Sequence, residues 1–378
     1  MIDKVVLAPY YLALKTRHLL YDKGIKKSYK ADVPTICLGN ITVGGTGKTP
    51  HTEMIIRLLQ NSPEWSNRNI AVLSRGYKRK SSRFQQVEAG GSAKFYGDEP
   101  MQIKNKFPNV TVAVDKNRVR GCEFLAHPEV LKADKKVKKC INPNFPAADV
   151  ILLDDAFQYR RLDSKLKIVL VDWARPTFRD HLLPIGSLRD LPGRISDADI
   201  VIVSKCPRYM DEWERTKWAT GLGIRNFSPV ECTGINEKGQ RQVLLFTTIG
   251  YDQLEPVFPE GDPRYMYSKR MVLFTGIAND KPLMTFLGDT YQLTKHIQFP
   301  DHHSFTASDI NQINAAVRAS STSIVVTTEK DSQRIAECKN IPLELKQRMF
   351  YAPIRVKFLT PAGEEVFKKE LFEAIASK

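Results

Sequence analysis

The hydrophobic residues of the first 205 positions fall mainly into short continuous runs separated by segments of helix length. Runs that are apolar at successive positions are typical of strands covered on both faces in a parallel α/β sheet. We therefore expect an α/β fold whose first domain is a doubly wound sheet. The expected strands are TICLG (35–39), IAVLS (70–74), VTVAV (110–114), VILLDD (150–155), KIVLVD (167–172) and DIVIVSK (199–205).

A second group of apolar runs follows Pro207, after a predicted helix over 208–222 and a polar stretch over 232–243. It predicts a second, smaller α/β domain. We place the first domain at 31–215 and the second at 216–378, with the possibility that the C-terminal residues return to the first domain. The expected strands of the second group are QVLLFTTI (242–249), RMVLFTGIA (270–278), YQLTKHIQF (291–299), SIVVTTEK (323–330) and MFYAPIRVKF (349–358).

The N-terminal 30 residues have a different pattern, with an uncharged run, VVLAPYYLAL (5–14), before several basic residues. Ten helical residues cover only about half of a ~30 Å hydrocarbon core. We therefore expect a helix at the membrane interface, and a helix packed on its own domain is the alternative. The residues expected to insert are Leu7, Tyr10, Tyr11, Leu14 and Leu20, and the basic residues are Lys15, Arg17, Lys23, Lys26 and Lys27.

A glycine-rich loop follows the first predicted strand and precedes an amphipathic helical pattern, in the segment GNITVGGTGKTPHTEM (39–54). This order predicts a phosphate-binding loop, in which backbone N–H groups, the lysine and the Thr hydroxyl serve phosphate and Mg²⁺. A glycine turn without nucleotide is the alternative. The expected nucleotide-binding residues are Thr42, Val43, Gly44, Gly45, Thr46, Gly47, Lys48, Thr49 and Pro50.

The loop lacks the first glycine of the pattern G-x-x-x-x-G-K-[ST], because Thr42 occupies that position. Threonine tolerates a left-handed backbone poorly. We therefore expect the backbone at Thr42 to avoid positive φ.

Carboxylates occur at two further points of the expected first domain. Asp154 and Asp155 end an apolar strand, where they are placed to bind a nucleotide-bound Mg²⁺ or its waters, and a helix cap is the alternative. Asp98 and Glu99 precede Pro100 at a predicted helix start, where a favourable interaction with the helix dipole is the simpler explanation.

The segment FPDHHSF (299–305) places two histidines beside an aspartate in a turn. No third ligand is spaced to complete a metal site. A histidine paired with a carboxylate suits proton transfer from an alcohol.

Composition narrows the partners but does not choose between them. The formal charge of +15 indicates an anionic partner, such as nucleic acid, an anionic bilayer or a phosphorylated substrate. Six scattered cysteines show no C-x-x-C pair, so neither a disulfide framework nor a zinc site is indicated.

Taken in order, several segments resemble the tetraacyldisaccharide 4′-kinase family, the lipid A 4′-kinases of Gram-negative bacteria. The resemblance extends from about residue 5 to about residue 331 and includes a loop that also lacks the first glycine. The segments are GNITVGGTGKTP, LSRGYKR, GDEP, DDAFQ, LLPIGSLRD, FTGIAND, FPDHHSF and TTEKD.

The resemblance implies a P-loop NTPase-like kinase that uses ATP and Mg²⁺ to phosphorylate the 4′-hydroxyl of an acylated glucosamine disaccharide 1-phosphate. It also implies a peripheral enzyme on the cytoplasmic face of the inner membrane. The implied partners are this lipid A precursor and an anionic membrane surface, with neither nucleic acid nor an obligate protein partner.

Carried over by position, the resemblance implies that Lys48 and Arg189 are catalytic, and that Asp98 and a histidine of DHH, for which we take His302, accept the proton. Asp190 stands where the family has Glu, which leaves its role open. The positions implied for metal binding are Thr49, Asp154 and Asp155, and those implied for substrate binding are Tyr77, Glu99, Arg118, Gln158 and Asp190.

Two rival classes share some of these features. A membrane-associated partitioning-type ATPase also combines GGTGKT with an amphipathic membrane segment, but such proteins carry an extra lysine near the loop start, where this chain has Val43. A nucleic-acid-dependent NTPase suits the pI of 9.4, but the basic residues lack interleaved aromatic residues for stacking on bases.

Overall fold

A computed structural model describes residues 2–133, 142–301, 303–319 and 322–376. The chain forms two compact units, one of residues 1–249 with 356–378 and one of residues 250–355. The chain leaves the first unit within strand β10 (Arg241–Tyr251) and returns within β16 (Ile354–Phe358), and these two strands pair.

The first unit is built on a sheet of 11 strands in the described part of the chain, in the order β3-β4-β2-β5-β1-β6-β7-β10-β9-β8, with β16 beside β10. The pairs from β4 to β10 are parallel, and β3, β9 and β8 add antiparallel edges. The predicted doubly wound α/β sheet is confirmed. Its other strands are β1 (Thr35–Gly39), β2 (Ile70–Ser74), β3 (Gln85–Gln86), β4 (Thr111–Val114), β5 (Val150–Asp154), β6 (Leu166–Asp172), β7 (Ile200–Ser204), β8 (Arg225–Ser228) and β9 (Thr233–Ile235).

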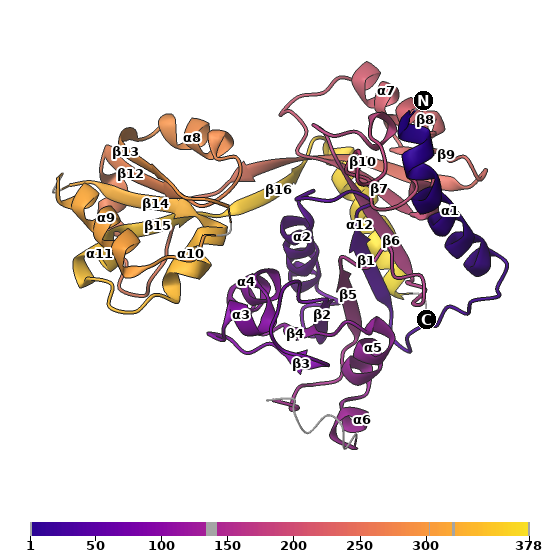
Figure 1. Cartoon of the computed structure of the whole chain (residues 1–378), viewed down its shortest axis with the longest axis horizontal. Helices are drawn as coiled ribbons and strands as arrows, with labels where there is room; N and C mark the ends of the chain where they lie inside the picture. The colour runs from indigo at the N-terminus through magenta and orange to yellow at the C-terminus, as the bar shows by residue number, and fades with distance from the viewer. Residues whose placement is uncertain (1, 134–141, 302, 320–321, 377–378) are drawn as a thin grey trace. The chain divides into compact units, whose positions relative to one another are not determined.

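Helices cover both faces of this sheet, and each face has its own apolar core (Figure 1). Helices α2, α4 and α12 pack on one face, against side chains such as Ile36 and Val72. Helices α1, α5 and α7 pack on the other, against side chains such as Cys37 and Leu73. The helices of this unit are α1 (Ile2–Asp22), α2 (Lys48–Asn61), α3 (Ala93–Tyr96), α4 (Asp98–Lys106), α5 (Arg118–Ala126), α6 (Pro128–Ala133), α7 (Glu212–Gly221) and α12 (Pro361–Ala376).

The second unit has a five-stranded sheet in the order β11-β15-β14-β12-β13, in which only β11 is antiparallel to its neighbour among the described strands. Helix α8 packs on one face of this sheet, and α9, α10 and α11 pack on the other. Its elements are β11 (Glu255–Pro256), β12 (Arg270–Thr275), α8 (Lys281–Gly288), β13 (Gln292–Gln298), α9 (Ala307–Arg318), β14 (Ile324–Thr328), α10 (Glu329–Ala336), α11 (Leu343–Arg348) and β15 (Met349–Ala352).

Two predicted strands belong elsewhere than expected. The run 242–249 was assigned to the second domain, yet β10 pairs in parallel with β7 and extends the first sheet. The single run 349–358 is two strands, β15 in the second sheet and β16 beside β10, because Pro353 has no N–H to continue a ladder. Residues 216–249 therefore belong to the first compact unit, whereas the sequence predicted that the second domain begins at residue 216.

Helix α1 packs one face on the first unit, as the alternative for the N-terminal segment foresaw. Leu14 is 8% exposed in the core, with Leu7 and Tyr10 packed against it. The prediction that Leu14 inserts into a membrane is therefore wrong, because that side chain is already buried. On the opposite face, Leu12 is 58% exposed and Leu19 48%. Among the described helices, none is both long enough and apolar enough to cross a bilayer.

Candidate active site

The glycine loop connects β1 to α2, as predicted. Gly44 and Gly47 have φ of 105° and 85°, which glycine adopts without strain. Thr42 is not among the described residues with positive φ, so the expectation for this position is confirmed. The reason is local pairing: Thr42 forms an antiparallel bridge with Leu188, and the Val43 N–H donates to the Ser187 carbonyl over 2.7 Å. An extended backbone at Thr42 needs no glycine.

Asn40, directly after β1, joins several side chains of the site and is fully buried. Its Oδ1 accepts from Lys48 Nζ at 3.4 Å and from the Arg189 guanidinium. Its backbone carbonyl accepts from Gln158 Nε2 and from Arg189 Nη2, the latter at 3.3 Å. Its Nδ2 donates to Thr42 Oγ1 at 3.3 Å. The sequence analysis missed Asn40, although a polar residue at the end of an apolar strand was a usable signal.

Asp155 binds two of the predicted catalytic cations. The Arg189 guanidinium donates to both carboxylate oxygens, one bond being 3.1 Å, and Lys48 Nζ lies 3.7 Å from Oδ1. Burial acts to raise the pKa of Asp155, but the bond from Arg189 and the charge of Lys48 outweigh it and lower the pKa. The backbone at Asp155 has φ of 50°, which aspartate tolerates better than most residues.

Asp154 has a different environment at the end of β5. It is 1% exposed, its Oδ2 accepts from Ser74 Oγ at 3.3 Å, and its Oδ1 has no hydrogen-bond partner. Burial, with the nearby charges of Glu99 and Asp155, raises the pKa of Asp154. A buried carboxylate with an unsatisfied oxygen calls for a cation or a proton.

These two carboxylates fit Mg²⁺ better than a metal held by protein ligands alone. The described residues contain no group of three or more His, Cys, Asp or Glu side chains placed to hold a metal. Mg²⁺ is usually bound through one or two carboxylates together with phosphate oxygens and waters. The unsatisfied Asp154 oxygen and the half-buried hydroxyl residue Thr49 suit that arrangement.

Other predicted site residues lie around this centre. Arg118 begins α5 and is 3% exposed, and its Nη2 donates to the Asp155 carbonyl at 3.4 Å while its Nε has no partner. Asp98 and Glu99 form the first turn of α4, and Glu99 is close enough to Asp154 to affect its ionisation. Tyr77 is 72% exposed in the loop after β2.

Asp190 does not face the centre formed by Asn40, Lys48 and Asp155. It is fully buried, its Oδ1 lies 2.6 Å from His18 Nε2, and it accepts from the Leu191 N–H at 2.8 Å. Arg189 bonds to Asn40 and Asp155 beside the loop, whereas Asp190 bonds to His18 of α1. A substrate contact by Asp190 stays a prediction.

The DHH segment belongs to the second unit. His302 lies outside the described residues. His303 is bound to Asp309 at 2.9 Å and stacks on Phe299 with ring centroids 4.8 Å apart. These contacts fix the His303 ring within its own unit, and the choice of His302 as the acting histidine stays a prediction.

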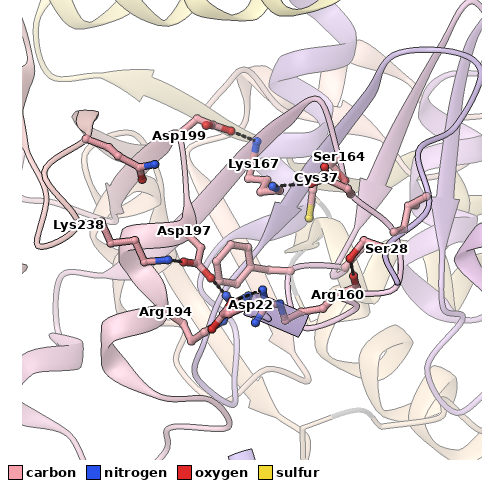
Figure 2. Close-up of a pocket in the computed structure, with 15 residues that line it drawn as sticks. Asp22, Ser28, Cys37, Arg160, Ser164, Lys167, Arg194, Asp197, Asp199 and Lys238 are labelled. Atoms are coloured by element: carbon pink, nitrogen blue, oxygen red, sulfur yellow. Dashed lines mark hydrogen bonds and ion pairs between the residues drawn. The ribbon is translucent and has the colours of Figure 1, made fainter. Parts of the chain in front are cut away.

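A separate pocket of about 320 Å³ lies beside the C-terminal end of α1 and is lined by neither the glycine loop nor Asp154 and Asp155 (Figure 2). Its charged side chains pair with one another: Arg160 binds Asp22 at 2.7 Å and Lys167 binds Asp163 at 2.7 Å. Both Arg194 and Lys238 bind Asp197. The pocket is therefore lined by an ion-pair network, of which the Arg160–Asp22 pair attaches the end of α1.

Residues 4–375 match the family described as Tetraacyldisaccharide-1-P 4'-kinase. The tetraacyldisaccharide 4'-kinase of Phocaeicola vulgatus is 38% identical, covering 95% of this chain and 90% of that protein. That of Parabacteroides distasonis is 36% identical, covering 92% and 88%.

A crystal structure of the apo form of LpxK from Aquifex aeolicus in complex with ATP has the same fold. Its TM-score is 0.67 at 24% identity, over 99% of this chain and all of that one. The resemblance seen in the motifs is thereby confirmed. The chain belongs to the tetraacyldisaccharide 4′-kinase family.

Proposed function

We propose that this protein transfers the γ-phosphoryl group of ATP to the 4′-hydroxyl of the acylated glucosamine disaccharide 1-phosphate. The observation that carries the proposal is the convergence of Lys48, Arg189 and Asp155 beside a glycine loop whose strand and helix have the order of a phosphate-binding loop. Kinase activity on a lipid A precursor follows from family membership.

Phosphoryl transfer through a loose transition state depends mainly on positioning and on neutralising charge. Lys48 and Arg189 supply two cations at the end of the loop, and Asp155 orients both. Thr49, Asp154 and Asp155 would hold Mg²⁺, which when bound neutralises phosphate charge. The other matched positions, Tyr77, Glu99, Arg118 and Gln158, would contact nucleotide or acceptor around this centre.

The acceptor hydroxyl loses a proton late in such a reaction, and we assign that proton to Asp98 and His302 acting together. If the two residues act as a catalytic pair, Asp98→Ala, His302→Ala and the double variant should lower kcat by similar factors. The effects of substituting residues that act together are not additive. Initial rates of the four proteins at saturating ATP measure this. Losses that multiply would show two independent roles, and a larger loss for His303→Ala would identify the other ring.

The acceptor is a lipid, so the enzyme must reach a bilayer. We propose that the protein is peripheral on the cytoplasmic face of the inner membrane and that the exposed face of α1 contacts anionic lipid. The formal charge of +15 and the exposed side chains Tyr11, Leu12 and Leu19 support this.

The decisive experiment is transfer of label from γ-³²P-ATP to the purified disaccharide 1-phosphate in mixed micelles. Labelled lipid that depends on Mg²⁺ and on the 4′-hydroxyl is the expected result. ATP hydrolysis that is stimulated by DNA or by self-association, without labelled lipid, would instead favour a partitioning-type ATPase.

A further inference from the structure

The carbonyl groups of the glycine loop are bound from outside the loop by four different side chains. The Val43 carbonyl accepts from Arg175 Nη1 at 3.2 Å, and the Gly45 carbonyl accepts from Lys205 Nζ. The Thr46 carbonyl accepts from Ser204 Oγ at 2.7 Å, and the Gly47 carbonyl lies 2.7 Å from His51 Nδ1. We call the carbonyls of Val43, Gly45, Thr46 and Gly47 the loop carbonyls.

The direction of the loop carbonyls determines the direction of the amides that follow them. In a planar trans peptide the N–H points opposite to the C=O. Holding the four carbonyls outward therefore turns the next N–H groups, on Gly44, Thr46, Gly47 and Lys48, to the other side. Within the described chain, the N–H groups of residues 44–47 donate to no protein acceptor. Successive backbone N–H groups without a protein acceptor are an anion-binding arrangement.

His51 differs from Arg175, Lys205 and Ser204 because it belongs to α2, the helix that directly follows the loop, and its side chain is fully buried. Its partner Gly47 is the N-cap residue of α2 and has no side chain to cap the helix. The Gly47 carbonyl can only accept a hydrogen bond, so His51 Nδ1 carries the proton. The bare Nε2 then accepts from Thr247 Oγ1 in β10 at 2.9 Å. Burial lowers the pKa of His51 to about 4, which agrees with a neutral ring.

We propose that His51 is a positioning residue for nucleotide binding. The hydrogen bond from its Nδ1 to the Gly47 carbonyl, which also accepts the His51 backbone N–H at 3.2 Å, fixes the Gly47–Lys48 peptide with its N–H toward the phosphates. It acts on ATP through the loop and touches neither ATP nor the acceptor. This inference rests on the proposed function, since it concerns the same nucleotide site.

The test compares substitutions that keep or remove each of the two hydrogen bonds. His51→Asn keeps a nitrogen donor near the position of Nδ1, while His51→Leu has a similar volume and no donor. His51→Gln keeps a polar group near Nε2 only, and Thr247→Val removes the outer bond alone. The measurements are the Kd of a fluorescent ATP analogue, KM for ATP, KM for the lipid acceptor, and Tm of the whole protein.

The Leu and Gln variants should bind the ATP analogue about five- to tenfold more weakly, the effect of losing roughly one hydrogen bond. The Asn and Thr247→Val variants should stay within about twofold of the wild type, and KM for the acceptor should not change in any of them. A purely structural role would lower Tm in all variants and move both KM values alike.

Two results would overturn the inference. One is a folded Leu variant that binds the analogue as the wild type does, and the other is an Asn variant as weak as the Leu variant. If the Leu variant does not fold, the comparison of Asn with Gln decides in the same way. A wild-type protein that binds no ATP analogue would instead overturn the proposed function, so the two failures are distinguishable.

Discussion

At the end of the glycine loop, Lys48 Nζ donates to Asn40 Oδ1 at 3.4 Å and forms an ion pair with Asp155 Oδ1 at 3.7 Å. It faces phosphate charge that grows during transfer, so Lys48→Ala should reduce kcat by at least about 100-fold, several kcal/mol of barrier. The measurement is the rate of label transfer at saturating ATP. Folding should change little, because Asp155 keeps its bonds from Arg189.

The matched control is Lys165→Ala, an exposed lysine before β6, which should retain the wild-type rate. Wild-type turnover by a cleanly folded Lys48→Ala protein would remove the loop from the mechanism.

Asn40 should matter nearly as much, although the sequence analysis did not select it. Its amide oxygen receives Lys48 and Arg189 together, so Asn40→Ala leaves both cations without one acceptor and free to move. A displacement of catalytic groups by about 1 Å costs on the order of 100-fold. We expect kcat to fall by roughly 10- to 100-fold while KM for the acceptor is kept, as measured by initial rates. Unchanged kcat would show that Asp155 alone holds the two cations.

The sequence predicted Lys48, Asp154 and Asp155 because a loop after a strand and carboxylates at a strand end are local patterns. Asn40 and His51 lie in the same segment but act through partners far along the chain, such as Arg189 and Thr247. No local pattern names those partners. Asp190 shows the same limit: its position in the motif did not reveal that the carboxylate faces away from Arg189 and toward α1.

Helix α1 is bonded to the two segments that reach Asn40. Tyr10 Oη donates to the Arg189 carbonyl at 3.0 Å, and Arg17 Nη2 donates to the Gln158 carbonyl at 2.7 Å. His18 binds Asp190, next in the chain to Arg189. The N-terminal helix therefore supports the backbone of the site, in addition to any contact with lipid.

Asp190→Asn should weaken this attachment in a pH-dependent way. Burial acts to raise the pKa of Asp190, but the hydrogen bond and charge of His18 outweigh it, so the pKa lies below its ordinary value of 3.8. A carboxylate with a lowered pKa stabilises the fold above its unfolded pKa, and this stabilisation is lost as the pH falls through the folded pKa. We expect the substitution to cost about 1.5 to 3 kcal/mol at pH 7 and much less at an acidic pH below the folded pKa.

Urea unfolding of both proteins at the two pH values measures the effect. A cost that is equal at pH 7 and at the acidic pH would mean that the Asp190 charge contributes nothing to the attachment of α1.

At the scale of elements, the sequence predicted the parallel strands closely because both faces of each strand are buried. The run at 35–39 is β1 without change. It could not predict sheet membership: β10 and β12 have the same apolar pattern, yet one extends the first sheet and the other belongs to the second. The apolar pattern of a strand indicates that the strand is buried. Which strand it pairs with depends on contacts that form only in the folded chain.

At the scale of the whole molecule, two α/β units were predictable from two groups of strands, whereas the return of α12 to the first unit was only a possibility. Phe367, Leu371 and Ile375 of this helix are buried against the first sheet, to which the chain has returned through β16 directly before the helix, after more than 100 residues in the second unit. An apolar helix face indicates that a helix packs, and it does not indicate on which sheet.

The proposed attachment of the whole protein to membranes gives a final prediction, in which the two faces of α1 have separate effects. Tyr11, Leu12 and Leu19 are exposed, so replacing all three by Ser should leave Tm nearly unchanged and move the protein from anionic vesicles to the supernatant in a sedimentation assay. Binding that remains through the basic residues after α1 should weaken with salt.

The control is Leu14→Ala on the packed face. It removes a buried side chain, so it should cost about 2 to 5 kcal/mol of stability and leave vesicle binding intact. Activity of the triple variant should fall most on substrate in vesicles and least on detergent-dispersed substrate, where docking is not needed. If the triple variant still sediments with vesicles at high salt, then α1 serves only to support the Arg189 and Gln158 segments, and another surface contacts the lipid.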